Sequence, residues 1–324
     1  MTAKKIFDLV REDLLRVEQE IALQNGSAIE PVAEIVGYLL GGGGKRLRPA
    51  LLLLSAGACD YRGPSAVRLG AVVELIHSAT LIHDDVIDGA DTRRGRPSAN
   101  SRWGNHMSVL AGDWLYMQSF QMALRERNFK ILDILIDLTQ NMVEGELIQL
   151  TKLGRIDLTE EDALALATRK TACLFSGCAR LGAVLGRGDA AGEQALADYG
   201  RYAGLAFQLV DDLLDFTASP EKLGKPVLSD LKEGKVTLPL IYALQNGESV
   251  GRRMVASVLA EKGFQSVRPE QITELVRNSG ALHRVRQLAY DYANRAKTCL
   301  DGWVDSEYGR ALLTVPDFIL DRDS

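Results

Sequence analysis

Paired cysteines and an excess of positive charge are both missing from this chain of 324 residues. Its four cysteines show no C-x-x-C spacing, so we interpret them as small buried or neutral residues in a reducing compartment. The formal net charge is -5, and no basic stripe dominates the sequence. We therefore do not expect nucleic acid as a partner. The cysteines are Cys59, Cys173, Cys178 and Cys299.

Long hydrophobic runs are missing as well. The first ten residues, MTAKKIFDLV, contain two lysines but no apolar stretch of signal-peptide length. The most apolar early stretch, Pro49 to Cys59, is too short to span a bilayer. We therefore expect no stable membrane insertion and a cytoplasmic location.

The alternating β-branched pattern that predicts strands is almost absent, whereas apolar residues recur at spacings of three and four. Thr159 with Asp162, and Ser65 before an apolar run, look like helix N-cap signals. The sequence is 46% hydrophobic, which is ample for a core, and it shows no solenoid repeat. We predict an all-α fold, in which residues 1–324 form a single-domain antiparallel helical bundle around a central cavity.

Two clusters of the form DDxxD are the most informative feature. Both lie in apolar segments that are expected to be helical, so the outer aspartates of each cluster share a helix face and repel one another. Buried carboxylates need a cation, and magnesium typically bridges one or two carboxylates to substrate phosphates. A lone match is as easily a solvated acidic turn, but two copies favour a metal–diphosphate site. The clusters are Asp84, Asp85 and Asp88, and Asp211, Asp212 and Asp215.

Cationic and polar residues accompany the clusters. The segment Gly41 to Pro49 has a glycine run that lets backbone approach an anion, although it lacks the Ser or Thr and the preceding strand of a P-loop. Arg93 and Arg94 follow the first cluster, and arginine suits bidentate phosphate contacts. Each segment alone reads as a solvated loop or linker. The remaining candidates are Lys45, Arg48, Lys170, Thr171, Gln208, Lys225 and Lys235.

Together these segments resemble the trans-isoprenyl diphosphate synthase family, and most closely its bacterial octaprenyl diphosphate synthases. The resemblance runs from about Gly41 to Pro239 and returns at Pro316 to Arg322. It implies a homodimer that transfers prenyl groups with Mg2+ as cofactor, uses isopentenyl diphosphate and an allylic diphosphate, and supplies quinone side chains. The motifs that carry it are GGGGKRLRP, HSATLIHDDVID, DTRRGRPSAN, AGDWLY, FQLVDDLLD and GKPVLSDLKEGKVTLP.

The resemblance also implies a role for each matching position. The metal ligands would be Asp84, Asp88, Asp211 and Asp215. The isopentenyl diphosphate would be bound by Lys45, Arg48, His77 and Arg94. The allylic diphosphate would be bound by Arg93, Lys170, Thr171, Gln208, Lys225 and Lys235. The catalytic set would be Asp84, Asp85, Asp88, Asp211, Asp212, Lys170 and Lys225.

The helix before the first cluster is expected to line a tunnel for the growing chain. One helical turn rises about 5.4 Å, roughly one isoprene unit. Ala79 and Thr80 lie one turn before Asp84 and are small, whereas short-chain relatives carry a blocking aromatic there. We therefore expect a long product, with Ile76 lining the tunnel further on. A facing helix at Gly112 to Leu124 offers four candidates for the tunnel floor: Trp114, Tyr116, Met117 and Phe120.

Other functions remain open at this point. A terpene cyclase or head-to-head synthase usually lacks a second DDxxD and the isopentenyl-site cations. A non-catalytic subunit of a heteromeric synthase would lose site residues that this chain retains. A shorter-chain synthase differs only in the tunnel. A di-iron bundle would need two ExxH motifs, and only Glu74 with His77 provides one.

Overall fold

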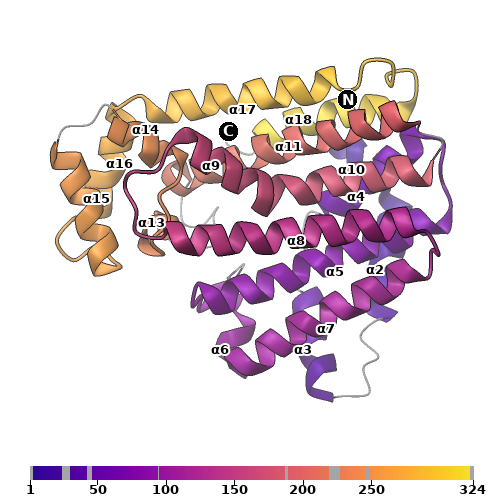
Figure 1. Ribbon diagram of the computed structural model, residues 1–324, viewed down its shortest axis with the longest axis horizontal. Helices are drawn as coiled ribbons and strands as arrows, with labels where there is room; N and C mark the ends of the chain where they lie inside the picture. Colours follow the sequence, from indigo (N-terminus) through magenta and orange to yellow (C-terminus); the bar gives the residue numbers. More distant parts are fainter. Residues whose placement is uncertain are drawn as a thin grey trace. The chain divides into compact units, whose positions relative to one another are not determined.

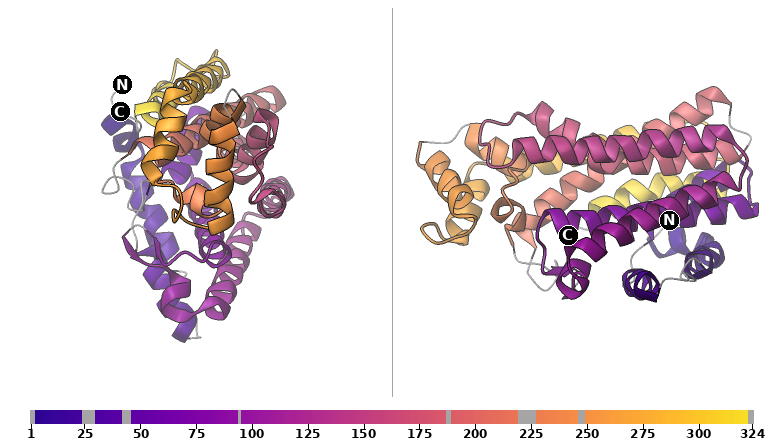
Figure 2. Two further views of the ribbon diagram at one scale, coloured as in Figure 1. Left: turned by 90° about the vertical axis from the view of Figure 1, so that its left-hand side faces the viewer. Right: turned by 60° about the horizontal axis from the view of Figure 1, so that its bottom comes forward.

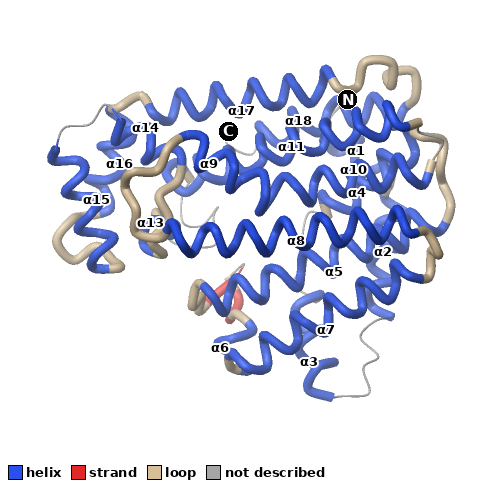
Figure 3. Tube along the Cα trace, in the orientation of Figure 1, coloured by secondary structure: helices blue, strands red, loops and turns tan. Residues whose placement is uncertain are grey.

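The computed structural model describes residues 3–23, 30–41, 46–93, 95–186, 189–218, 227–245 and 249–321. Almost all of these residues are helical, which confirms the predicted all-α class (Figure 1). Within these ranges the sheet structure is one short hairpin, in which β1 (Thr92–Arg93) pairs antiparallel with β2 (Arg96–Pro97) (Figure 3). The low content of alternating β-branched sequence accounts for this result.

The chain divides into two compact units. Unit 1 comprises Met1–Thr139, Leu174–Gly200 and Thr298–Val315, and unit 2 comprises Gln140–Cys173, Arg201–Lys297 and Pro316–Ser324. The division falls within the helices α8 (Phe129–Lys152), α11 (Ala190–Thr217) and α18 (Glu307–Leu320). That residues 1–324 form one domain stays a prediction.

Unit 1 contains the helices of the first half of the chain. Its elements besides parts of α8, α11 and α18 are α1 (Ala3–Leu9), α2 (Arg11–Leu23), α3 (Glu30–Leu40), α4 (Leu47–Ala58), α5 (Pro64–Ile87), the hairpin, α6 (Ala99–Trp103), α7 (Asn105–Leu124) and α10 (Cys173–Leu185). Helix α5 forms the centre of this unit, since α2, α4, α6 and α7 all pack against it. Figures 1 and 2 show α5 and α7 side by side.

Local sequence explains how α5 forms and packs. Pro64 occupies the first helical position, where its missing N–H costs nothing, and Gly63 is the N-cap. The N-cap expected at Ser65 is therefore wrong. A Cβ at Gly112 of α7 would lie 2.2 Å from Nε2 of His83, so this glycine lets α7 approach α5 closely.

Helix α5 is also the one helix in the described ranges that is long and apolar enough to cross a membrane, by length and composition. Of its most apolar window, 67% is buried inside the protein. The core helix of a soluble protein has the same character.

Unit 2 contains the rest of α8, α11 and α18 and the elements between them. These are α9 (Glu160–Ala167), the π-helical turn η1 (Thr168–Ala172), α13 (Ser229–Lys232), α14 (Leu238–Gln245), α15 (Ser249–Glu261), α16 (Pro269–Asn278) and α17 (Ala281–Thr298). Helix α14 packs on α9 and α16, and α15 packs on α13 and α16. Figure 2 shows α15 and α16, drawn in orange, from two further sides.

Thr159 is the N-cap of α9, and it forms a capping box with Asp162, as predicted. Cys59 and Cys178 are buried, as expected, while the other two cysteines are half-buried. Burial raises the pKa of the Cys59 thiol to about 12, so this thiol is neutral at physiological pH.

Candidate active site

The first aspartate cluster lies at the C-terminal end of α5, in unit 1. Asp85 is buried, with 1% of its side chain exposed, while Asp84 and Asp88 are half-buried. The guanidinium of Arg93 donates through Nε to Oδ1 of Asp85 at 2.7 Å, and its Nη2 lies 2.6 Å from the same oxygen. Burial raises the pKa of Asp85, and the contact with Arg93 opposes that rise.

The hairpin that carries Arg93 is held firmly to the end of α5. Ser98 donates through its hydroxyl to the carbonyl of Ala90 at 2.6 Å, and its N–H donates to the carbonyl of Asp91 at 2.9 Å. Gly95 has a φ of 72°, which the tight turn between the two short strands requires. Arg94, the other predicted arginine of this loop, lies outside the described residues.

Two predicted isopentenyl-site residues meet in unit 1. Nη1 of Arg48 lies 3.1 Å from Nε2 of His77, and the guanidinium stacks 5.2 Å from the ring centre of Phe175. An arginine can only donate, so Nε2 of His77 is the acceptor in this contact. Lys45, which precedes them in the glycine-rich segment, lies outside the described residues.

His77 also lines a cavity of about 60 Å³ beside the first cluster, together with Asp85 and Arg93. Glu74, the other half of the ExxH pattern, lies in this cavity too, and Nη1 of Arg46 donates to its Oε1 at 2.5 Å. Glu74 thus has an arginine as its counter-ion, as buried carboxylates require. This pairing agrees with rejecting a di-iron site.

The second aspartate cluster lies on α11, in unit 2. Asp212 accepts a hydrogen bond of 2.8 Å from Nε2 of Gln208, whose Oε1 accepts one of 2.6 Å from the hydroxyl of Thr171. Burial raises the pKa of Asp212 well above its usual value, and the charges of neighbouring aspartates add to the rise. A carboxylate in such surroundings favours a bound cation.

The third aspartate of this cluster has a different setting. Asp215 is 1% exposed, and its Oδ1 accepts hydrogen bonds from the N–H and the hydroxyl of Ser229, at 3.2 and 3.1 Å. The residue therefore anchors the start of α13 to α11. Asp211, at the start of the cluster, is half-buried.

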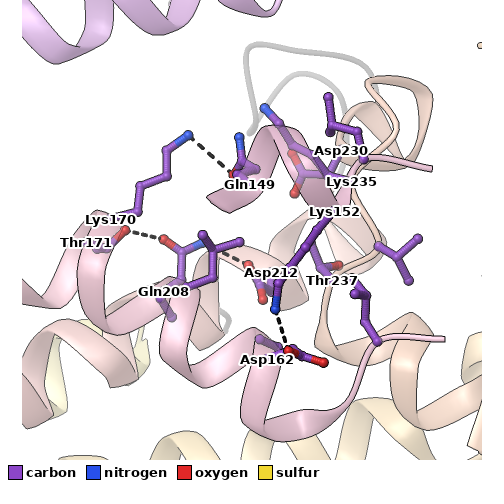
Figure 4. Close-up of a pocket in the computed structure, with 16 residues that line it drawn as sticks. Gln149, Lys152, Asp162, Lys170, Thr171, Gln208, Asp212, Asp230, Lys235 and Thr237 are labelled. Carbon is purple, nitrogen blue, oxygen red and sulfur yellow. Dashed lines mark hydrogen bonds and ion pairs between the residues drawn. The ribbon is translucent and has the colours of Figure 1, made fainter. Parts of the chain in front are cut away.

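Five of the predicted residues meet in one pocket of unit 2 of about 210 Å³: Lys170, Thr171, Gln208, Asp212 and Lys235. Figure 4 shows the hydrogen-bonded chain from Thr171 through Gln208 to Asp212. The pocket combines these polar groups with apolar side chains, so it suits a ligand with an anionic and a hydrocarbon part. Lys225, the remaining allylic-site cation, lies outside the described residues.

Sequence reasoning missed three residues of this region. Gln149 and Glu146 on α8 contact Lys170, and Asp230 lines the pocket. The signal for Asp230 was present, because it lies in the quoted motif GKPVLSDLKEGKVTLP. The three-residue spacing of Glu146 and Gln149 places them on one helix face, but nothing local shows which element that face meets.

The carboxylates fit magnesium in the mode that sequence reasoning expected. Within the described ranges, no three His, Cys, Asp or Glu side chains gather closely enough to hold a metal by themselves. Magnesium commonly takes only one or two carboxylates and completes its shell with waters and substrate phosphates. The half-buried pair Asp84 and Asp88, one helical turn apart, fits that mode.

The residues predicted to line the tunnel lie on α5. Ile76 and Ala79 are fully buried, and the hydroxyl of Thr80 donates to the carbonyl of His77 at 2.7 Å. The facing helix was predicted correctly, because α7 packs along α5. Met117, one of the four candidates for the tunnel floor, is 62% exposed in the single chain, so it does not line a space enclosed by this chain alone.

Comparison with known proteins gives one consistent result. The chain matches the family description "Polyprenyl synthetase" over residues 29–276. It is 38% identical to the octaprenyl diphosphate synthase of Escherichia coli strain K12, over 323 residues that cover 100% of both chains. It is 36% identical to the short chain isoprenyl diphosphate synthase of Methanothermobacter thermautotrophicus over 290 residues, 88% of this chain and 89% of that one.

A solved structure agrees. The polyprenyl synthase of Caulobacter crescentus CB15, complexed with calcium and isoprenyl diphosphate, superimposes with a TM-score of 0.95 at 34% identity and covers 100% of this chain and 98% of that chain. These matches confirm the resemblance that the motifs indicated. The chain therefore belongs to the polyprenyl synthetase family and is a trans-polyprenyl diphosphate synthase, a prenyltransferase that joins isopentenyl and allylic diphosphates.

Proposed function

We propose that the protein is a long-chain synthase that extends farnesyl diphosphate to a product near octaprenyl length for quinone side chains. The observation that carries the proposal is the small, fully buried Ala79 one turn before Asp84. The residues that precede Ala79 further back along α5 are not aromatic either. They are Ile76, Leu75, Val73 and Val72. The similarity to an octaprenyl diphosphate synthase supports the same length.

The alternative is a shorter product. A relative with a short-chain name is 36% identical, so overall similarity does not separate the two lengths. The test is to incubate the purified protein with farnesyl diphosphate, labelled isopentenyl diphosphate and Mg2+, and to size the products. A product near octaprenyl length supports the proposal, and a product that ends at farnesyl or geranylgeranyl length overturns it. An inactive single chain would favour a subunit of a heteromeric enzyme.

We also propose Mg2+ as the cofactor, bound by Asp84, Asp88, Asp211 and Asp215. The Caulobacter relative was crystallised with calcium and isoprenyl diphosphate, which supports use of a divalent ion. When bound, magnesium supplies positive charge that stabilises a departing diphosphate. Asp85 and Asp212 are buried beside these ligands, and their neighbours Arg93 and Gln208 hold them in place.

In this proposal the diphosphate-binding residues form two groups, one for each substrate. The isopentenyl diphosphate is held by Lys45, Arg48, His77 and Arg94, and the contact between Arg48 and His77 supports a shared site. The allylic diphosphate is held by Arg93, Lys170, Thr171, Gln208, Lys225 and Lys235. Four of these line one pocket together with Asp212, which supports a common ligand: Lys170, Thr171, Gln208 and Lys235.

The chain's own residues then account for the chemistry. Lys170 and Thr171 hold the allylic diphosphate while its C–O bond ionises. The double bond of isopentenyl diphosphate attacks the allylic carbocation, and a proton leaves C2 of the new unit to the released diphosphate. Buried apolar side chains such as Ile76 and Ala79 exclude the water that would quench the cation.

We propose, finally, a cytoplasmic homodimer. Leu110, Met117 and Leu124 recur every seven residues along α7, and they are 61%, 62% and 47% exposed. Such a stripe on a helix suits pairing with the same surface of a second copy. Light scattering of the purified protein measures this directly, and a monomeric mass at micromolar concentration contradicts it.

A further inference from the structure

Helix α8 and the π-helical turn η1 approach each other unusually closely in unit 2. A Cβ built on Gly145 of α8 would lie 3.0 Å from Cβ of Arg169 and 3.2 Å from the backbone nitrogen of Lys170. Ordinary van der Waals contacts of a Cβ begin at about 3.4 Å. The atoms it would meet are the backbone of Arg169 and Lys170 and the Cβ of Arg169, which is fixed to that backbone, so none of them can swing aside as the end of a flexible side chain can. Gly145 therefore sets how near η1 lies to α8.

The turn η1 is a rare element. It spans Thr168–Ala172 between α9 and α10, and it carries both Lys170 and Thr171. A single π turn inside an α-helix is intrinsically less favourable than regular helix, and such turns often occur at functional sites. Contacts from outside the helix must stabilise it, and α8 provides them.

Side chains of α8 hold Lys170 through a closed set of contacts. Nζ of Lys170 lies 2.5 Å from Oε2 of Glu146 and donates to Oε1 of Gln149 at 3.4 Å. Nε2 of Gln149 donates in turn to Oε1 of Glu146 at 3.0 Å. The side chain of Glu146 is only 13% exposed, so water screens the ion pair weakly.

The neighbouring ion pair on the same turn is different. Arg169 donates through Nη1 to Oε2 of Glu144 at 2.7 Å, but these side chains are 39% and 44% exposed. Exposed pairs of this kind contribute little. Glu144 and Glu146 are thus two carboxylates on one helical turn, of which only Glu146 contacts a predicted substrate-binding residue.

The turn η1 is also connected to the second aspartate cluster through hydrogen bonds. Thr171 donates to Gln208, and Gln208 donates to Asp212, as Figure 4 shows. A displacement of η1 would therefore move the hydroxyl of Thr171, at which this series of hydrogen bonds begins. Lys170 and Thr171 come to the pocket together because one turn carries them both.

We propose that Gly145 and Glu146 are positioning residues for the allylic diphosphate, which act through Lys170 and Thr171 without touching the substrate. The proposal rests on the function proposed above for these two residues. A free lysine side chain loses rotamer freedom when it binds a ligand, and the contacts with Glu146 and Gln149 remove much of that freedom before the substrate binds. Gly145 fixes the backbone from which both side chains project.

The first test is Gly145→Ala, with Gly251→Ala as the matched control. Gly251 is a buried helical glycine of α15 whose Cβ would meet Cδ1 of Leu275 at 3.0 Å, a side chain that can move. A misplacement of 1 Å can cost about a hundredfold, so a shift of a few tenths of an ångström should cost about threefold to tenfold. We expect this rise in the KM for farnesyl diphosphate, with an unchanged KM for isopentenyl diphosphate. An unchanged KM for farnesyl diphosphate in Gly145→Ala overturns the role of Gly145.

The second test compares Glu146→Gln with Glu144→Gln, which remove the same charge from the same turn. Calorimetry with pyrophosphate and Mg2+ measures binding without requiring turnover. We expect Glu146→Gln to weaken binding about threefold to tenfold, as for a displaced binding group, and Glu144→Gln to leave it unchanged. Tighter binding in Glu146→Gln overturns the proposal, because Glu146 would then compete with the diphosphate for Lys170. This pair carries the test if Gly145→Ala does not fold.

The two proposals fail in distinguishable ways. If the parent protein does not elongate farnesyl diphosphate, the proposed function is wrong, while calorimetry still tests the positioning role. If the parent elongates it and Lys170→Ala weakens pyrophosphate binding, but neither Gly145→Ala nor Glu146→Gln does, only the positioning role is wrong.

Discussion

Replacing Ala79 by phenylalanine tests the proposed tunnel most directly. Ala79 lies five residues before Asp84 on α5 and is fully buried. Five residues at about 1.5 Å each place the new ring about 7.5 Å along the helix from Asp84. An isoprene unit is roughly as long as one helical turn of about 5.4 Å. The ring should therefore stop elongation within the first few units.

The thermal stability of the Ala79→Phe protein shows whether Ala79 borders a tunnel or an ordinary packed core. If Ala79 borders open space, the ring fits and the melting temperature changes little. If Ala79 borders packed side chains, overpacking should cost about 1 to 3 kcal/mol. We expect the first result together with a shorter product, and Ala79→Tyr should behave in the same way.

The assay is product sizing with labelled isopentenyl diphosphate, and thermal unfolding is measured in parallel. Geranyl diphosphate should be offered beside farnesyl diphosphate, because the ring restricts the length of the primer as well. Ala79→Ser is the control, since it changes the residue without adding bulk. An unchanged product length in a folded Ala79→Phe protein would refute the placement of the tunnel along this face of α5.

Three further predictions concern Asp84, Asp162 and Gly112. Asp84→Ala should lower kcat at least about a hundredfold, and chelation of Mg2+ should abolish activity reversibly; a fully active variant contradicts the metal role. Asp162→Ala should lower the free energy of unfolding by about 0.5 to 2 kcal/mol at pH 7, because the capping box loses the carboxylate that accepts from the N–H of Thr159. The hydrogen bond from Lys152 depresses the pKa of Asp162, so this stability is fully present above the ordinary pKa of about 4. It declines progressively as pH falls from there towards the lower pKa of the folded protein, and the urea titrations of parent and variant should approach one another over that range. Gly112→Ala should destabilise the protein by about 1 to 3 kcal/mol, because its Cβ would overlap the ring of His83; an unchanged melting temperature would show that the ring moves freely.

Local features of the fold were predictable from the sequence. The capping box of Thr159 and Asp162 was found because a cap depends on residues three apart. The expected cap at Ser65 was wrong because the adjacent Pro64 starts the helix itself. The all-α class followed from a helical period that each segment carries in its own sequence.

Residues of the site were predictable from the sequence only where they belong to a recognisable motif. Lys170, Thr171, Gln208 and Lys235 meet in one pocket, which their separation in the sequence does not show. Glu146 has no motif signal of its own, because its role depends on which element α8 packs against. Met117 was one of four candidates for the tunnel floor, and the sequence does not show that its side chain is exposed in the single chain.

The sequence by itself determined the helical class and the positions of the two aspartate clusters, because period, charge and spacing are local properties. Only the tertiary structure decided that Asp85 is neutralised by Arg93 and that Glu146 holds Lys170. It also showed that a glycine of α8 admits the π-helical turn. These facts arise from packing between elements far apart in the chain, where burial weakens the screening of charge and a single Cβ decides how closely two backbones approach.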